Sequence, residues 1–175
     1  MLDSLGRAYL TAMKVVLGLL SLALLAIAGW GVFSRNILDR SVVWADTTNT
    51  WIFVWIIFLG SALAVYRGAH MEVGAARDAM PPVVQKLLML VGYAAVAAAS
   101  AFLTYAGFKF LEVSGDTPSP ATGTDLKWVL WAFPVGGVLM TLTAVERLVR
   151  ALFVPADEYV QRLRQARESA VEEGL

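Results

Sequence analysis

Four long apolar runs constrain the fold of this chain more than any other feature of its sequence. They cover about residues 13–33, 47–66, 84–108 and 126–149, and each can cross a hydrocarbon core of ~30 Å as an α-helix. With 58% hydrophobic and 16% charged residues, the composition also differs from that of ordinary soluble domains. We therefore predict an all-α integral membrane protein, with four transmembrane helices in residues 1–155 and a charged, helical cytoplasmic tail in residues 156–175.

The first run has one alternative interpretation, a cleaved signal peptide. Arg7 and Lys14 precede the apolar residues, and Ala26-Ile27-Ala28 resembles a small-residue cleavage site. The apolar run continues past that site through Trp30 and Phe33. This continuation favours a transmembrane helix.

The distribution of Lys and Arg predicts how the helices are oriented. Ten of the 14 basic residues lie near the two termini or in the segment from Arg67 to Lys86, and four lie in the other two connections. Because basic residues accumulate on the cytoplasmic side of a membrane, both termini are expected in the cytoplasm, beneath a bacterial inner membrane. All six tryptophans then belong to the outer halves of the spans, which indicates either an interfacial belt in lipid or an outer surface covered by protein.

The residue types missing from the spans exclude several functions. No Asp, Glu, Lys, Arg or His occurs in residues 15–33, 51–66, 87–108 or 128–145, whereas proton-coupled exporters need ionisable groups at membrane depth. The chain has no cysteine and one histidine, His70, so one copy can form neither a thiolate metal centre nor a bis-histidine haem site. Its 14 basic and 14 acidic residues cancel, which leaves no overall field to attract nucleic acid. We expect no catalytic site, cofactor or metal.

Small residues recur at four-residue spacing in two spans and allow helix backbones to approach closely. Packing within the chain is the commoner use of such a series, and a seam with another subunit is the alternative. The fourth span contains Pro134, followed by Val135-Gly136-Gly137, which predicts a packing bend rather than half of an ion site. The small-residue series are Gly60, Ala64 and Gly68 in the second span, and Ala94 with Ala98 or Ala95 with Ala99 in the third.

Several segments in and around the second span form a recognisable pattern. They are Phe33 to Asn36, Trp44-Ala45-Asp46, the helix from Phe53 to Ala62, Arg67-Gly68-Ala69-His70, Met71-Glu72-Val73 and Phe133 to Gly136. This pattern resembles the small membrane subunits, the DctQ family, of tripartite ATP-independent periplasmic (TRAP) transporters. One departure is Asp46-Thr47, where the family commonly has two acidic residues.

The resemblance implies a small accessory subunit of a sodium-coupled transporter for an organic acid or related solute. In this arrangement a large multi-span permease subunit moves solute and sodium, a periplasmic solute-binding protein captures the solute, and the small subunit supports both while contacting membrane lipid. We expect the second and fourth helices to contact the large subunit and the first and third connections to help dock the binding protein. The residues predicted at these interfaces are Trp44, Asp46, Trp55, Gly60, Ala64, Arg67, His70, Pro134 and Gly136.

A different class of function remains open at this stage, a stand-alone four-helix membrane protein such as a redox-complex anchor or a membrane enzyme. An enzyme should show convergent titratable groups in a pocket, and a haem anchor needs axial ligands. The sequence shows neither feature, which favours the accessory subunit.

Overall fold

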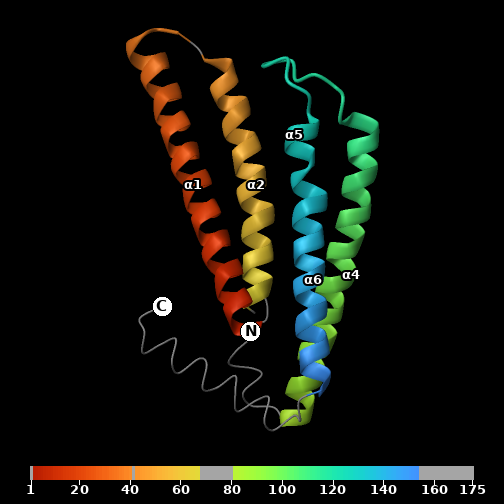
Figure 1. The fold of residues 1–175 in the computed structure, drawn as a ribbon. Helices are drawn as coiled ribbons and strands as arrows, with labels where there is room; N and C mark the ends of the chain where they lie inside the picture. The colour runs from red at the N-terminus through yellow and green to blue at the C-terminus, as the bar shows by residue number, and fades with distance from the viewer. Residues whose placement is uncertain (1, 41, 68–80, 154–175) are drawn as a thin grey trace, which may run out of the picture.

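The computed structural model describes residues 2–40, 42–67 and 81–153, and these segments are helical apart from short connections (Figure 1). Four stretches are long and apolar enough to cross a membrane: Ala8–Ile37, Val43–Arg67, Val83–Ser114 and Lys127–Phe153. The prediction of an all-helical chain with four candidate spans is therefore confirmed. The predicted tail and His70 lie outside the described residues. The helices are α1 (Leu2–Ile37), α2 (Val43–Arg67), α4 (Pro82–Ser114), α5 (Lys127–Leu130) and α6 (Ala132–Phe153).

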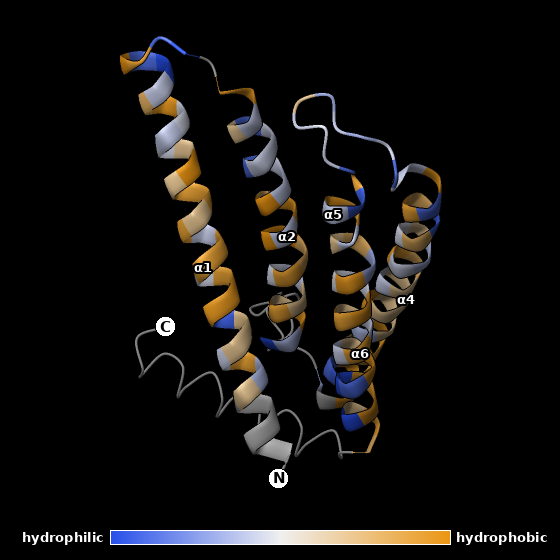
Figure 2. Ribbon diagram, turned by 45° about the horizontal axis from the view of Figure 1, so that its top comes forward, coloured by the Kyte–Doolittle hydropathy of each residue, from blue (hydrophilic) through white to orange (hydrophobic). Residues whose placement is uncertain are grey.

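The helices begin and end at residues that suit helix termini. Pro82 occupies the first turn of α4, where a missing N–H costs nothing. Asp46 lies in the first turn of α2 and Arg67 in its last turn, so both charges complement the helix dipole. Hydrophobic residues dominate the middle of the long helices and polar residues gather towards their ends (Figure 2). The helices are accordingly longer than the apolar runs, because backbone hydrogen bonding continues past the hydrocarbon core.

The long helices form a row in the order α1, α2, α6 and α4, rather than a closed four-helix bundle (Figure 1). α6 packs most extensively against α4 and also against α2, while α1 packs chiefly against α2. Burial is lowest at α1 and highest at α6: the most apolar window of α1 has no buried residue, whereas half of the corresponding window of the fourth span is buried. The described core lies where α2, α4 and α6 meet, around Ala62, Val65, Met140 and Ala144.

Small and hydroxyl residues make up the seam between α4 and α6. The Thr141 hydroxyl donates to Ser100 Oγ at 2.9 Å, and a Cβ added to Gly137 would lie 2.4 Å from the Thr104 hydroxyl oxygen. On α4, a Cβ added to Gly107 would lie 2.9 Å from the Cβ of Phe133. In a membrane, where association has no hydrophobic drive, such close approach and interhelical hydrogen bonding hold helices together.

The fourth span is interrupted at Trp131, three residues before Pro134. Proline has no N–H to donate to Leu130, and its ring crowds the carbonyl of that residue. The helix therefore stops at Leu130 and resumes at Ala132. The sequence predicted a bend in this span, and the bend stays a prediction, because Trp131 keeps helical backbone angles of φ −59° and ψ −22° at the interruption.

Candidate partner-binding surfaces

One face of α2 is largely exposed, with only Gly60 and Ala64 partly buried along it. Its positions alternate in spacing by four and three residues, which keeps them on one side of an α-helix. Phe53 is 54% exposed and Ile57 is 45% exposed, and a Cβ added to Gly60 would meet no atom within 4 Å. This face, which we call the α2 stripe, consists of Asp46, Thr50, Phe53, Ile57, Gly60, Ala64 and Arg67.

The other sides of α2 are covered by this chain. Ala45 is completely buried and packs against Gly31 of α1. Leu59, Ala62 and Val65 are also buried, and the last two belong to the core shared with α4 and α6. Four of the predicted interface residues, Asp46, Gly60, Ala64 and Arg67, thus share the stripe that the chain leaves open.

The small residues of α4 divide into two sets. Ser100, Thr104 and Gly107 face α6, whereas the alanines at 94, 95, 98 and 99 are exposed. Packing within the chain, the commoner use expected for these alanines, is therefore wrong for them. Packing within the chain also does not account for Gly60 of α2, because a Cβ added there would meet no atom within 4 Å.

Three predicted interface residues are used inside the chain. The indole N–H of Trp55 donates to the Trp128 carbonyl oxygen at 3.0 Å, which lies just before the interruption of the fourth span. Pro134 is fully buried, and a Cβ added to Gly136 would lie 2.6 Å from the Cβ of Phe58. Their described contacts position α2 against α5 and α6.

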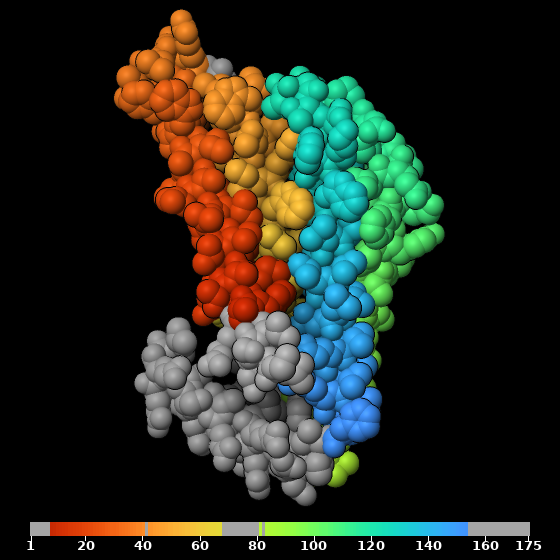
Figure 3. All heavy atoms as spheres, viewed as in Figure 1, coloured from red at the N-terminus to blue at the C-terminus, as the bar shows by residue number. Residues whose placement is uncertain are grey.

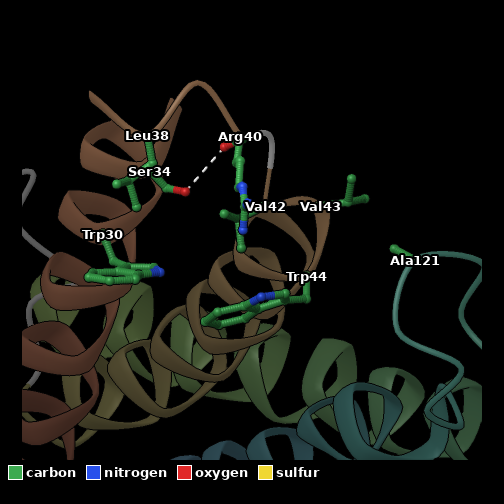
Figure 4. Close-up of a pocket in the computed structure, with 8 residues that line it drawn as sticks. All are labelled: Trp30, Ser34, Leu38, Arg40, Val42, Val43, Trp44 and Ala121. Atoms are coloured by element: carbon green, nitrogen blue, oxygen red, sulfur yellow. Dashed lines mark hydrogen bonds between the residues drawn. The ribbon is translucent and has the colours of Figure 1, made fainter. Parts of the chain in front are cut away.

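A groove of about 540 Å³ opens beside the turn between α1 and α2 (Figure 4). Trp30 of α1 and Trp44 of α2 lie on its two sides, and Arg40 comes from the turn between them. Trp44, a predicted interface residue, therefore faces a different surface from Asp46. We call this site the turn groove, and its lining also includes Ser34, Leu38, Val42, Val43 and Ala121.

The turn beside this groove has a defined hydrogen-bonded conformation. The Ser34 carbonyl accepts the backbone N–H groups of Leu38 at 3.1 Å and Arg40 at 3.2 Å. The buried Ser34 hydroxyl donates to the Arg40 carbonyl oxygen at 3.1 Å. Asp39 has a φ of 51°, in the left-handed region that Asp tolerates better than most residues. These contacts fix where Arg40 leaves the turn.

The connection between α4 and α5 is also ordered by internal contacts. The Ser119 N–H donates to the Thr124 carbonyl at 2.9 Å, and the Gly123 N–H donates to the Ser119 carbonyl at 2.8 Å. Gly123 has a φ of 69°, which glycine adopts without strain. Lys127 forms an ion pair with Asp125 at the base of the connection. These contacts give the connection a compact shape.

Two polar residues that the sequence interpretation did not single out hold α2 in place. Arg147 of α6 donates to the Tyr66 carbonyl oxygen, and its guanidinium carbon lies 5.0 Å from the centre of the Tyr66 ring. Near the other end of α2, the Asn49 amide can donate to the Leu24 carbonyl at 3.1 Å and accept from the Ala28 N–H at 3.3 Å. The amide orientation with these two bonds satisfies both of its polar atoms. Asn49 lies within the polar segment from Asp46 to Thr50, and this segment carries no sequence signal for the contact.

Comparison with known proteins points to one family. A model of the family described as tripartite ATP-independent periplasmic transporters, DctQ component, matches residues 24–154, which is more than half of the chain. The chain is also 24% identical over 126 residues to the sialic acid TRAP transporter small permease protein SiaQ of Vibrio cholerae serotype O1. That alignment covers 72% of this chain and 73% of the relative.

Proposed function

The chain belongs to the DctQ-component family of tripartite ATP-independent periplasmic transporters, and from this membership we propose that it scaffolds a large permease subunit and helps couple it to a periplasmic solute-binding protein. It is a multi-pass membrane protein and a transporter subunit, not an enzyme. In the proposed complex, the large subunit carries the solute together with sodium, and this chain fixes the large subunit in the membrane.

The α2 stripe is the observation that carries this proposal. Asp46 and Arg67 mark its two ends, exposed Phe53 and Ile57 occupy its centre, and Gly60 leaves a shallow site beside them. Alternating spacings of three and four residues suit a long contact with another helix at a crossing angle of about 20°. We assign a helix of the large subunit to this surface.

A matched set of glycine substitutions tests the assignment. Gly60→Leu fills the open site on the α2 stripe, while Gly18→Leu adds the same side chain to α1, where Gly18 also has open space. Each variant is tagged and purified from detergent-solubilised membranes, and the co-purified large permease subunit is identified and quantified by mass spectrometry. Overpacking of an interface costs about 1–3 kcal/mol, so Gly60→Leu should reduce recovery about tenfold. Gly18→Leu should retain it.

The same experiment can contradict the proposal in two ways. Recovery of a folded, stable chain with no large subunit, even without any substitution, would favour the stand-alone membrane protein. Equal recovery with Gly60→Leu and the unsubstituted chain would remove the α2 stripe from the interface. Thermal unfolding of each purified variant serves as the folding control.

We propose that the outer surface that docks the solute-binding protein includes the compact connection between α4 and α5. Thr124 is exposed there, so Thr124→Trp adds bulk without entering the helix packing. This variant should raise the concentration of binding protein needed for half-maximal uptake while leaving co-purification of the large subunit intact. Unchanged uptake kinetics would contradict this role for the connection.

The proposed solute is an organic acid. The name of the Vibrio cholerae relative attributes sialic acid to that protein, and sialic acid is a carboxylated sugar. Uptake of radiolabelled carboxylate solutes into vesicles containing all three components tests both the solute and the coupling. Uptake should require an inward sodium gradient, and equal uptake with potassium in its place would exclude sodium coupling.

The proposed orientation places both termini in the cytoplasm, in accordance with the distribution of basic residues. The chain has no cysteine, so single cysteines report cleanly on sidedness. A membrane-impermeant maleimide applied from the periplasm should label Thr122→Cys and leave Ser169→Cys unlabelled until the membrane is disrupted. The reverse pattern would invert the topology.

A further inference from the structure

We propose that the turn groove binds one phospholipid, with its phosphate at Arg40 and its acyl chains along the seam between α1 and α2. This site lies apart from the α2 stripe and does not depend on the identity of the transported solute. Three properties of the groove carry the inference: unpaired donors, apolar walls and position at the end of two membrane-spanning helices.

Three side chains of the turn groove, those of Arg40, Trp30 and Trp44, donate to no acceptor among the described residues. Arg40 takes part in none of the ion pairs found there, and the indole N–H groups of Trp30 and Trp44 donate to no described acceptor. Trp55, by contrast, donates its N–H to a carbonyl within the chain. Figure 4 shows the Arg40 side chain directed from the turn into the space between the two indole rings.

A cation and two N–H donors facing one space suit an anion with several oxygen acceptors. Arginine in particular binds phosphate through paired hydrogen bonds. The same groove has apolar walls, since Leu38 is 48% exposed and Val43 is 57% exposed. A ligand that satisfies both features carries a phosphate group at one end and hydrocarbon at the other.

The position of the groove selects a lipid over a soluble anion. Trp30 lies seven residues before the end of α1 at Ile37, which corresponds to about 10 Å along the helix. Trp44 is the second residue of α2. Tryptophan favours the headgroup region of a bilayer, and about three turns below Trp30 on the same face of α1, Leu19 is 62% exposed. A phosphate held by Arg40 therefore has hydrocarbon-facing surface directly beneath it.

The proposal also explains how the outer part of α1 is covered. α1 packs chiefly against α2, and on the face in Figure 3 its outer end projects beside α2 with the two surfaces diverging. Acyl chains can fill such a divergence without requiring a precise protein surface. The lipid would thus complete the contact between the outer ends of α1 and α2.

Native mass spectrometry of the full chain, purified in detergent with its complex partners, tests the site. Dioleoyl phosphatidylglycerol is titrated as the probe, and the half-saturating concentration for retention of one lipid is measured. Arg40→Gln removes the charge and should raise that concentration about tenfold. Trp44→Phe keeps a ring but loses the N–H and should raise it about threefold. Arg35→Gln is the matched control, because Arg35 is an exposed arginine of the last turn of α1 that does not line the groove.

Each alternative occupant predicts a different result. Equal effects of Arg40→Gln and Arg35→Gln would mean non-specific contact with bulk lipid and would overturn the proposal. If inorganic phosphate stabilised the protein against heat as much as dioleoyl phosphatidylglycerol does, the groove would be a free-anion site. If dioleoylglycerol, which has no phosphate, stabilised it as much, the groove would recognise no phosphate. Unchanged lipid retention in Arg40→Gln, combined with loss of binding-protein docking, would assign the groove to an acidic protein segment instead.

Discussion

Adding one methyl group at Gly136 should test the packing that positions α2. In Gly136→Ala, the new Cβ would lie 2.6 Å from the Cβ of Phe58 and 3.2 Å from two atoms of its ring. Favourable contact between carbon atoms requires about 3.5–4.0 Å, so α2 and α6 must separate by about 1 Å. The Phe58 side chain cannot relieve the closest contact by rotating, because its Cβ is fixed to the backbone.

The loss of stability caused by the clash at Gly136 can be separated from the gain in helix propensity by comparison with Gly60→Ala. Replacing a glycine by alanine within a helix gains up to about 1 kcal/mol from propensity, and this gain applies to both positions. Overpacking costs about 1–3 kcal/mol, and it applies only at Gly136, since Gly60 has open space. The free energy of unfolding of Gly136→Ala should therefore be about 1–3 kcal/mol lower than that of Gly60→Ala.

Reversible unfolding of the purified subunit in mixed micelles, followed by circular dichroism, measures this difference. Equal stability of the two variants would refute the close contact between α2 and α6. Phe58→Ala in the Gly136→Ala background provides a further check, because alanine retains the Cβ that makes the closest contact. Full recovery of stability in that double variant would mean that the ring, not the Cβ, causes the clash.

Two further predictions concern hydrogen bonds within the membrane-spanning part. Trp55→Phe should lower the free energy of unfolding by about 0.5–1.5 kcal/mol, because it leaves the Trp128 carbonyl without the indole donor; no change would show that the bond contributes nothing. For the hydroxyl pair of the α4–α6 seam, a double-mutant cycle with Ser100→Ala and Thr141→Val should give a coupling of about 0.6 kcal/mol, and strictly additive effects would contradict the contact.

The sequence predicted the number of helices well, because a membrane-spanning helix needs a long apolar run and few other structures tolerate one. It predicted their ends less well. The first run extends over residues 13–33, but α1 begins at Leu2 and ends at Ile37. Apolar composition reports the depth of the hydrocarbon core, whereas the helix continues wherever its backbone hydrogen bonds are more favourable than exposure to water.

A single sequence could not predict which neighbour, if any, each helix face contacts. Gly60 and Gly136 both follow the rule that small residues permit close packing, yet Gly136 contacts Phe58 and Gly60 faces open space. The partner interface predicted for Trp55 stays a prediction, and within the chain its N–H donates to the carbonyl of Trp128, 73 positions away. These outcomes depend on which helices are neighbours, and that order is a property of the whole row.

The row of helices also bears on what this subunit can do by itself. A pathway for a polar solute must be enclosed by protein that offers polar groups at membrane depth. The described spans carry ionisable residues only towards their ends, and four helices in the order α1, α2, α6 and α4 enclose no central space for a pathway. α2 has two distinct roles in this arrangement, since its covered sides contact α1 and α6 and its stripe stays open. The geometry therefore favours a scaffold, in which the covered sides of α2 set the angle at which its open stripe meets the large subunit.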